Sequence, residues 1–103
     1  MIFLALLEKD GQAPFNNSMN IKTLADFKRY LLNGGKIQLL SVNGQAPAEK
    51  ISGIRIVEKM QSNSCNFQGG SWLYFPKASL FSVNKENKTV TLDGLTYLII
   101  DNN

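Results

Sequence analysis

The segment "QSNSCNFQGGSWLYFPKASLF", residues 61–81, gathers the side chains of this chain that are best suited to chemistry or recognition. It contains the only cysteine, Cys65, the only tryptophan, Trp72, and the pair Gly69 and Gly70. The chain has no histidine, so the usual general base, imidazole metal ligand and triad member are missing. Carboxylates and serines are present, but no spacing pairs a nucleophile with a base. We therefore expect a protein that is not an enzyme.

Cys65 and the glycine pair both have structural interpretations. One cysteine cannot form an internal disulfide, and one sulfur without histidine does not build the usual zinc site. A packed structural thiol is predicted for Cys65, because free cysteine is among the residue types most often buried. Gly69 and Gly70 precede a strand-like segment and lack the lysine and helix of a phosphate-binding loop, so they predict a hairpin turn. No cofactor and no metal are expected.

The aromatic residues that follow the glycines suggest a recognition surface. A strand over residues 71–75 would place Trp72 and Tyr74 on one face and Leu73 and Phe75 on the other. One pair must pack in the core, which leaves the other pair exposed or covered by a helix. Tryptophan and tyrosine dominate the energetics of protein interfaces. The predicted partner-binding residues are Trp72, Tyr74, Phe75 and Lys77, and burial of both Trp72 and Tyr74 would contradict this prediction.

The charge of the chain leaves a second kind of partner open. Eleven Lys and Arg residues face eight Asp and Glu residues, for a net charge of +3. The densest basic group includes Lys28, Arg29 and Lys36, with Asp26 among them. An ordinary solvated helix face is one interpretation of this group. The alternative is a nucleic-acid-binding small β-barrel, in which these cations meet phosphates and neighbouring aromatic rings stack on bases.

A helix is predicted over residues 23–35, "TLADFKRYLLNGG". Thr23 is a suitable N-cap, and Asp26 three residues later completes a weak form of the capping box. Apolar residues recur along one stripe of this helix. Residues 33–35, Asn-Gly-Gly, predict a left-handed stop. The apolar stripe consists of Leu24, Phe27 and Leu31, with Tyr30 beside it.

The rest of the chain has the pattern of short strands. These segments cover residues 36–42, 51–61, 71–75, 80–83, 89–92 and 95–100. Asp93 and Gly94 form the strongest hairpin signal, and Gly53 suggests a bulge or a bend. The expected fold is α+β: one N-terminal helix packed on a small, strongly curved antiparallel sheet or barrel of about five to six strands. The helix is expected to cover an open end or an edge.

The chain is expected to be a single domain over residues 1–103. Residues 19–103 form the expected core domain, because the chain from Met19 onward has the pattern of a complete unit, and residues 1–18 would then be an N-terminal extension. The apolar run over residues 2–7 is too short for a signal-peptide core or a membrane span. We therefore predict no membrane association and a cytoplasmic location in a bacterial host cell.

Three segments carry a resemblance to a family. The segments "TLADFKRYL", "QSNSCNFQGGSWLYFPKASLF" and "TVTLDGLTYLII" resemble a group of short proteins encoded by phages and mobile elements. Members share a helix with "DFK", a "QSNS" strand and a tryptophan followed by "FPKAS". The resemblance covers residues 19–103, and the preceding segment departs from the pattern. It implies a non-enzymatic protein that binds and blocks a host protein, such as a defence nuclease.

The leading prediction is a small non-enzymatic binding protein of a phage or mobile element. It would associate stoichiometrically with a protein partner and inhibit a host defence system. Mimicry of DNA is disfavoured because the chain is basic. The alternatives are the nucleic-acid-binding module and an assembly protein that forms homo-oligomers. Pairing between apolar edge strands such as "LTYLII" is one route to a homodimer, and the alternative, an edge that another strand of the chain covers, is equally open.

Overall fold

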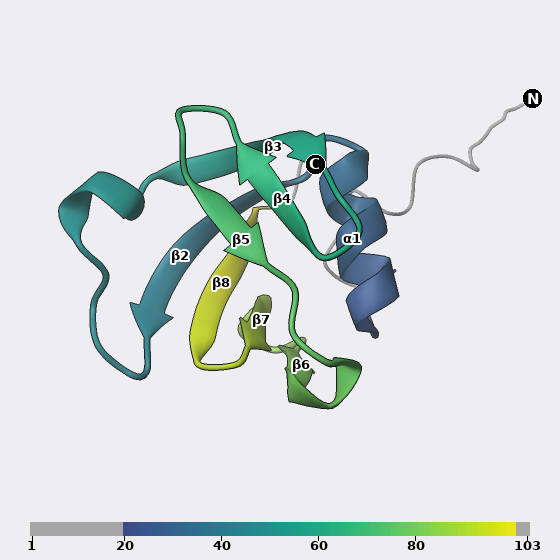
Figure 1. Cartoon of the computed structure of the whole chain (residues 1–103). Helices are drawn as coiled ribbons and strands as arrows, with labels where there is room; N and C mark the ends of the chain where they lie inside the picture. The colour runs from purple at the N-terminus through teal and green to yellow at the C-terminus, as the bar shows by residue number, and fades with distance from the viewer. Residues whose placement is uncertain (1–19, 101–103) are drawn as a thin grey trace, which may run out of the picture.

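Residues 20–100, which the computed structural model describes, begin with helix α1 (Leu24–Leu32) and continue as an antiparallel sheet (Figure 1). The strands are β2 (Lys36–Val42), β3 (Ile54–Met60), β4 (Ser64–Phe67), β5 (Trp72–Tyr74), β6 (Phe81–Asn84), β7 (Thr89–Leu92) and β8 (Leu95–Ile100). Two short 3-10 helices, η3 (Glu49–Ile51) and η4 (Ala78–Leu80), lie in the connections. The strand order is β5-β4-β3-β2-β8-β7-β6. The predicted α+β class, with one N-terminal helix on an antiparallel sheet, is confirmed.

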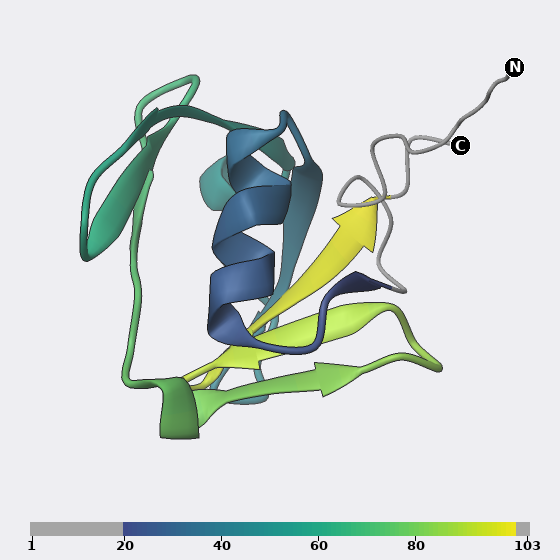
Figure 2. The same cartoon turned by 90° about the vertical axis from the view of Figure 1, so that its right-hand side faces the viewer.

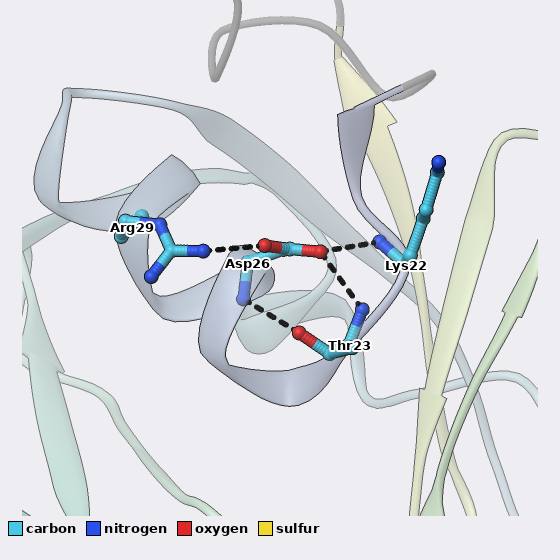
Figure 3. A network of polar contacts seen from close by, with 4 residues as sticks. All are labelled: Lys22, Thr23, Asp26 and Arg29. Atoms are coloured by element: carbon cyan, nitrogen blue, oxygen red, sulfur yellow. Dashed lines mark hydrogen bonds and ion pairs between the residues drawn. The ribbon is translucent and has the colours of Figure 1, made fainter.

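Helix α1 begins with the predicted capping box, which Figure 3 shows from close by. The hydroxyl of Thr23 accepts a hydrogen bond from the Asp26 backbone N–H (3.1 Å), and the Asp26 carboxylate accepts from the backbone N–H of Thr23 (3.1 Å). The same carboxylate accepts from the Lys22 backbone N–H (3.0 Å) and from the Arg29 guanidinium (2.5 Å). These bonds satisfy backbone donors that the first helical turn leaves without partners.

The helix ends where the sequence predicted. Gly34 has a φ of +85°, which glycine adopts without a steric penalty. The N–H of Gly34 donates to the carbonyl oxygen of Leu31 (3.1 Å), and that of Gly35 donates to Tyr30 (2.9 Å). This pair of bonds is the Schellman arrangement. The chain therefore turns sharply from α1 into β2.

Tight turns join the strands of the sheet. Asp93 and Gly94 have φ values of +46° and +91°, as a type I′ turn requires, and they connect β7 to β8. Gly69 and Gly70 lie in the turn between β4 and β5, which confirms the predicted hairpin. Gly53 lies in a bend just before β3, which is one of the two predicted possibilities. It is not in a bulge, because the register shift between β3 and β4 falls between Val57 and Lys59.

Helix α1 lies on one face of the sheet, with the β4–β5 hairpin on one side of it and β6, β7 and β8 on the other (Figure 2). The predicted apolar stripe faces the sheet: Phe27, Tyr30 and Leu31 are buried, and Leu24 is partly buried. The strands contribute alternating buried side chains to the same core, among them Ile37, Leu39, Val90, Leu92, Tyr97 and Ile99.

The prediction of a barrel or strongly curved sheet is wrong. Strands β5 and β6 are at opposite ends of the strand order and do not pair, so the sheet is open. Residues 75–80, which link β5 to β6, contain Pro76 and a 3-10 helix. Because proline has no N–H and the 3-10 helix is not extended, this link cannot supply the row of backbone hydrogen bonds that would close the sheet. Helix α1 also occupies the space beside the sheet, where Phe27 and Phe81 have ring centroids 5.7 Å apart. The helix thus covers a face, not an end or an edge.

Two further predictions need correction. Within residues 20–100 the sheet has seven strands, not five to six. The short β4 is absent from the predicted strand segments, because the polar residues Ser64 and Asn66 alternate with its core residues and weaken its strand pattern. Strand β8, "LTYLII", is not an edge strand, because it lies between β2 and β7. Dimerisation through β8 is therefore blocked by its own neighbours.

The predicted extension, residues 1–18, and the start of the core at Met19 lie outside the described residues. Within residues 20–100, no helix is both long and apolar enough to cross a membrane.

Candidate partner-binding surface on strand β5

Trp72 and Tyr74, two of the four predicted recognition residues, lie on β5, which is at one end of the sheet, and the other two, Phe75 and Lys77, follow this strand. Within the described part of the chain, β5 pairs only with β4. Leu73 is 2% exposed and lies opposite the buried Cys65. Phe75 is partly buried against the core. The alternation along the strand is as predicted, and Leu73 and Phe75 are the inward pair.

Trp72 and Tyr74 are the outward pair. Their exposed fractions are 59% and 70%, which are large values for aromatic residues in a small domain. The cross-strand neighbours of Trp72 and Tyr74 in β4 are Asn66 and Ser64, respectively. The two rings therefore stand on a polar hairpin face, where they are accessible to a partner.

Three pockets surround Trp72. One, of about 280 Å³, lies between residues 72–76 and the β7–β8 turn, where Leu92 and Asp93 contribute to its wall. A second, of about 290 Å³, is lined mainly by apolar side chains. A third, of about 430 Å³, is lined by Lys50, Ile51 and residues 70–72. Because Trp72 lines all three pockets, we refer to them together as the β5 groove.

Arg55 on β3 lines the second pocket of the β5 groove. Its Nη2 donates to the carbonyl oxygen of Lys50 (2.7 Å), which ties β3 to the loop that contains η3. Its Nε is buried and has no hydrogen-bond partner. Sequence reasoning did not select Arg55. The only signal for it was a cation that alternates with Ile54 and Ile56 in an otherwise apolar segment.

Phe75 and Lys77 differ from the other two predicted residues. The ring of Phe75 packs on the core, and the Nζ of Lys28 lies 4.9 Å from its centroid, within the range of a cation–π contact. Lys77 is exposed in the link between β5 and η4. The structure thus brings Trp72 and Tyr74 together on one surface, turns Phe75 inward, and leaves Lys77 at the margin.

The three cations of the nucleic-acid alternative have different surroundings. Lys28 donates to the carbonyl oxygen of Ser62 (3.3 Å) as well as contacting Phe75. Arg29 forms an ion pair with Asp26 (2.5 Å). Lys36 is exposed at the start of β2. Two of the three are thus engaged in contacts within the chain.

Cys65 is fully buried at the base of the β4–β5 hairpin. Burial raises the pKa of the Cys65 thiol to about 11, although a backbone hydrogen bond with Leu73 acts in the opposite direction. The neutral thiol at physiological pH is a poor nucleophile. Within residues 20–100, no three side chains of the His, Cys, Asp and Glu types are grouped as metal ligands would be.

In comparisons with known proteins, no protein-family model, no curated protein and no solved structure matches this chain.

Proposed function

We propose that this chain is a small non-enzymatic binding protein that associates stoichiometrically with a protein partner through Trp72 and Tyr74. The observation that carries the proposal is the exposure of both rings on strand β5, 59% and 70%, beside the β5 groove. Exposed aromatic side chains next to a pocket are typical of the residues that contribute most to binding energy.

The resemblance to short proteins of phages and mobile elements supplies the biological setting of the proposal. In that setting the partner is a host protein, and its occupation by this chain inhibits a defence system. The proposal needs no catalytic group, because stoichiometric association alone would block the partner.

The test is affinity capture with the full chain from lysates of the cells that encode or host it. The Trp72→Ala/Tyr74→Ala double variant is compared with Leu32→Ala, which removes another exposed apolar side chain (61%) on helix α1. We expect a protein that co-purifies in a fixed ratio with the unaltered chain and with Leu32→Ala. The double variant should retain roughly tenfold less of it.

Nuclease treatment of the lysate separates the two classes of partner. A protein partner is retained after treatment, whereas material bridged by DNA or RNA is lost. Equal recovery of every captured protein by the double variant and by Leu32→Ala would contradict the proposal.

A further inference from the structure

Among residues 20–100, the backbone of β5 has one edge with no strand paired to it. Phe67 N donates to Ser71 O (2.8 Å) and Phe75 N donates to Asn63 O (2.8 Å). Backbone groups of an antiparallel strand point alternately toward and away from its partner. The N–H and C=O groups of Trp72 and Tyr74 therefore point away from β4, and no described strand lies on that side.

The β5 groove adjoins this edge and can hold side chains. The first pocket separates β5 from the β7–β8 turn and has no lining residue from β4. The second has a floor from the sheet, where Leu39 and Tyr97 are buried, and a wall from Phe67 and Trp72. At about 290 Å³ it is near the lower limit of ligand pockets, which suits one or two apolar side chains.

Arg55 gives the groove a charge that nothing in the described chain neutralises. Its Nη2 bonds only a backbone carbonyl, its Nε has no partner, and no described carboxylate forms an ion pair with it. Lys50 lines the adjoining pocket, and Lys77 follows β5. The opposing charge at the groove is Asp93, on the far wall of the first pocket. A partly buried cation in an apolar wall is stabilised by a carboxylate from outside.

We infer that the partner binds as an extended peptide segment that adds a strand to the free edge of β5. The segment carries an apolar side chain, which enters the pocket bordered by Trp72, and a neighbouring Asp or Glu, which pairs with Arg55. This inference rests on the proposed function and names the chemistry of its partner. Main-chain bonds to Trp72 and Tyr74 supply affinity, and the pocket and Arg55 supply specificity.

A nucleic acid is the less suitable anion for this site. The groove presents Lys50 and Arg55 among apolar side chains, and a phosphate backbone needs a longer track of exposed cations. The helix cations Lys28 and Arg29 are engaged elsewhere. An acidic and apolar strand satisfies both the charge and the pocket.

The test uses a displayed library of random linear twelve-residue peptides, selected on the immobilised full chain. We expect enriched peptides with apolar residues at alternate positions and an Asp or Glu beside one of them. Since Trp72 is the only tryptophan, peptides free of tryptophan can be titrated by its fluorescence. Failure to enrich any peptide, or enrichment without acidic residues, overturns the inference.

Two variants test the two parts of the site. Tyr74→Pro removes the outward N–H but leaves the bonds to β4, and Tyr74→Ala is its control because it removes only the side chain. Arg55→Met removes the charge and keeps the stem, and Lys59→Met is its control, because Lys59 is exposed on the same strand outside the groove. We expect Tyr74→Pro to bind roughly tenfold more weakly than Tyr74→Ala, and Arg55→Met roughly tenfold more weakly than Lys59→Met.

The outcomes distinguish this inference from the proposed function. If a captured protein depends on Trp72 but binds Tyr74→Pro as well as Tyr74→Ala, strand addition is wrong and the proposed function stands. If no protein depends on Trp72 and Tyr74, the proposed function itself fails. Salt-sensitive binding of single-stranded DNA or RNA in the groove, in place of peptides, also overturns the inference.

Discussion

Tyr30 joins helix α1 to the sheet through both its ring and its hydroxyl. The side chain is fully buried, and its Oη lies 2.7 Å from the carbonyl oxygen of Lys36 and 2.8 Å from that of Ile100. These two residues are cross-strand partners in β2 and β8. The hydroxyl has one proton, so it donates to the two oxygens in turn or shares the proton between them. Gly35 packs directly on the ring.

Gly35→Ala should destabilise the fold by about 1–3 kcal/mol, because the new Cβ would overlap the Tyr30 ring and displace it from its two hydrogen bonds. Urea denaturation measures the change. Gly53→Ala is the control, since its Cβ meets nothing within 4 Å, and it should be neutral or slightly stabilising. Equal effects of the two substitutions would show that the Tyr30 contact is unimportant.

Cys65 should make stability depend on alkaline pH. Its pKa is raised to about 11 in the fold from an ordinary 9.0, so the folded state keeps a proton that the unfolded state loses. The free energy of unfolding should therefore fall as the pH rises from about 9 toward about 11, by up to about 2 kcal/mol. Cys65→Ala should show a smaller fall in the same titration, even though its stability at neutral pH is lower. An unchanged pH slope in the variant would contradict this explanation.

Helix α1 is the element whose two ends are most fully determined by hydrogen bonds between residues close in the chain. Asp26 accepts from two backbone N–H groups and from Arg29, and Thr23 accepts from Asp26 in return (Figure 3). These contacts, first of all the hydrogen bond from the Lys22 backbone, hold the pKa of Asp26 below its usual 3.8. The charged carboxylate is therefore part of the cap.

Asp26→Asn should remove a component of stability that is present above about pH 4 and lost as the pH falls through the lowered pKa of Asp26. Urea midpoints between pH 2 and pH 6 should have a shallower slope in the variant. Asp93→Asn is the control, because it also replaces a carboxylate with an amide, and asparagine is a residue that a type I′ turn accepts. Thr23→Ala should cost about 1 kcal/mol at every pH in that range.

Strand β5 has opposite roles on its two faces, and neighbouring substitutions should separate them. Leu73→Ala should destabilise the fold by about 2–5 kcal/mol, because it empties a core position that is 2% exposed. Tyr74→Ala should change stability by less than about 0.5 kcal/mol. Thermal and urea unfolding measure both. Comparable losses from the two variants would mean that Tyr74 packs within the fold, which would remove it from the proposed surface.

At the scale of the whole molecule, residues 20–100 form an open sheet with one α-helix packed on one of its faces. Its two ends, β5 and β6, differ in what lies beside them: β5 borders the groove that contains Trp72, and β6 contacts the helix through Phe81. Ile21, just before the helix, is fully buried in the same core. The core within residues 20–100 therefore includes a residue at the very start of this range.

A chain that begins at Met19 should keep this core and unfold cooperatively, as the predicted division at residues 18 and 19 implies. A chain that begins at Lys22 lacks Ile21 and should lose about 2–5 kcal/mol relative to it. Calorimetry or urea denaturation of the two chains gives the comparison. Loss of folding in the longer of the two would show that the core domain needs residues before Met19.

Local features of the sequence were sufficient to predict helix α1, both of its ends, the turns at Gly69 and at Asp93, and the alternation along β5. Each depends on contacts between residues close in the chain, so a short window contains the physical cause. The sequence by itself determined that one of two residue pairs, Trp72 with Tyr74 or Leu73 with Phe75, must pack in the core, which leaves the other pair exposed or covered by a helix. Only the tertiary structure decided that Trp72 and Tyr74 are the exposed pair, that the sheet stays open, and that Arg55 and Trp72 line the same groove. Those features depend on strand order and on the helix that fills one face, and such long-range contacts have no signature in a local pattern.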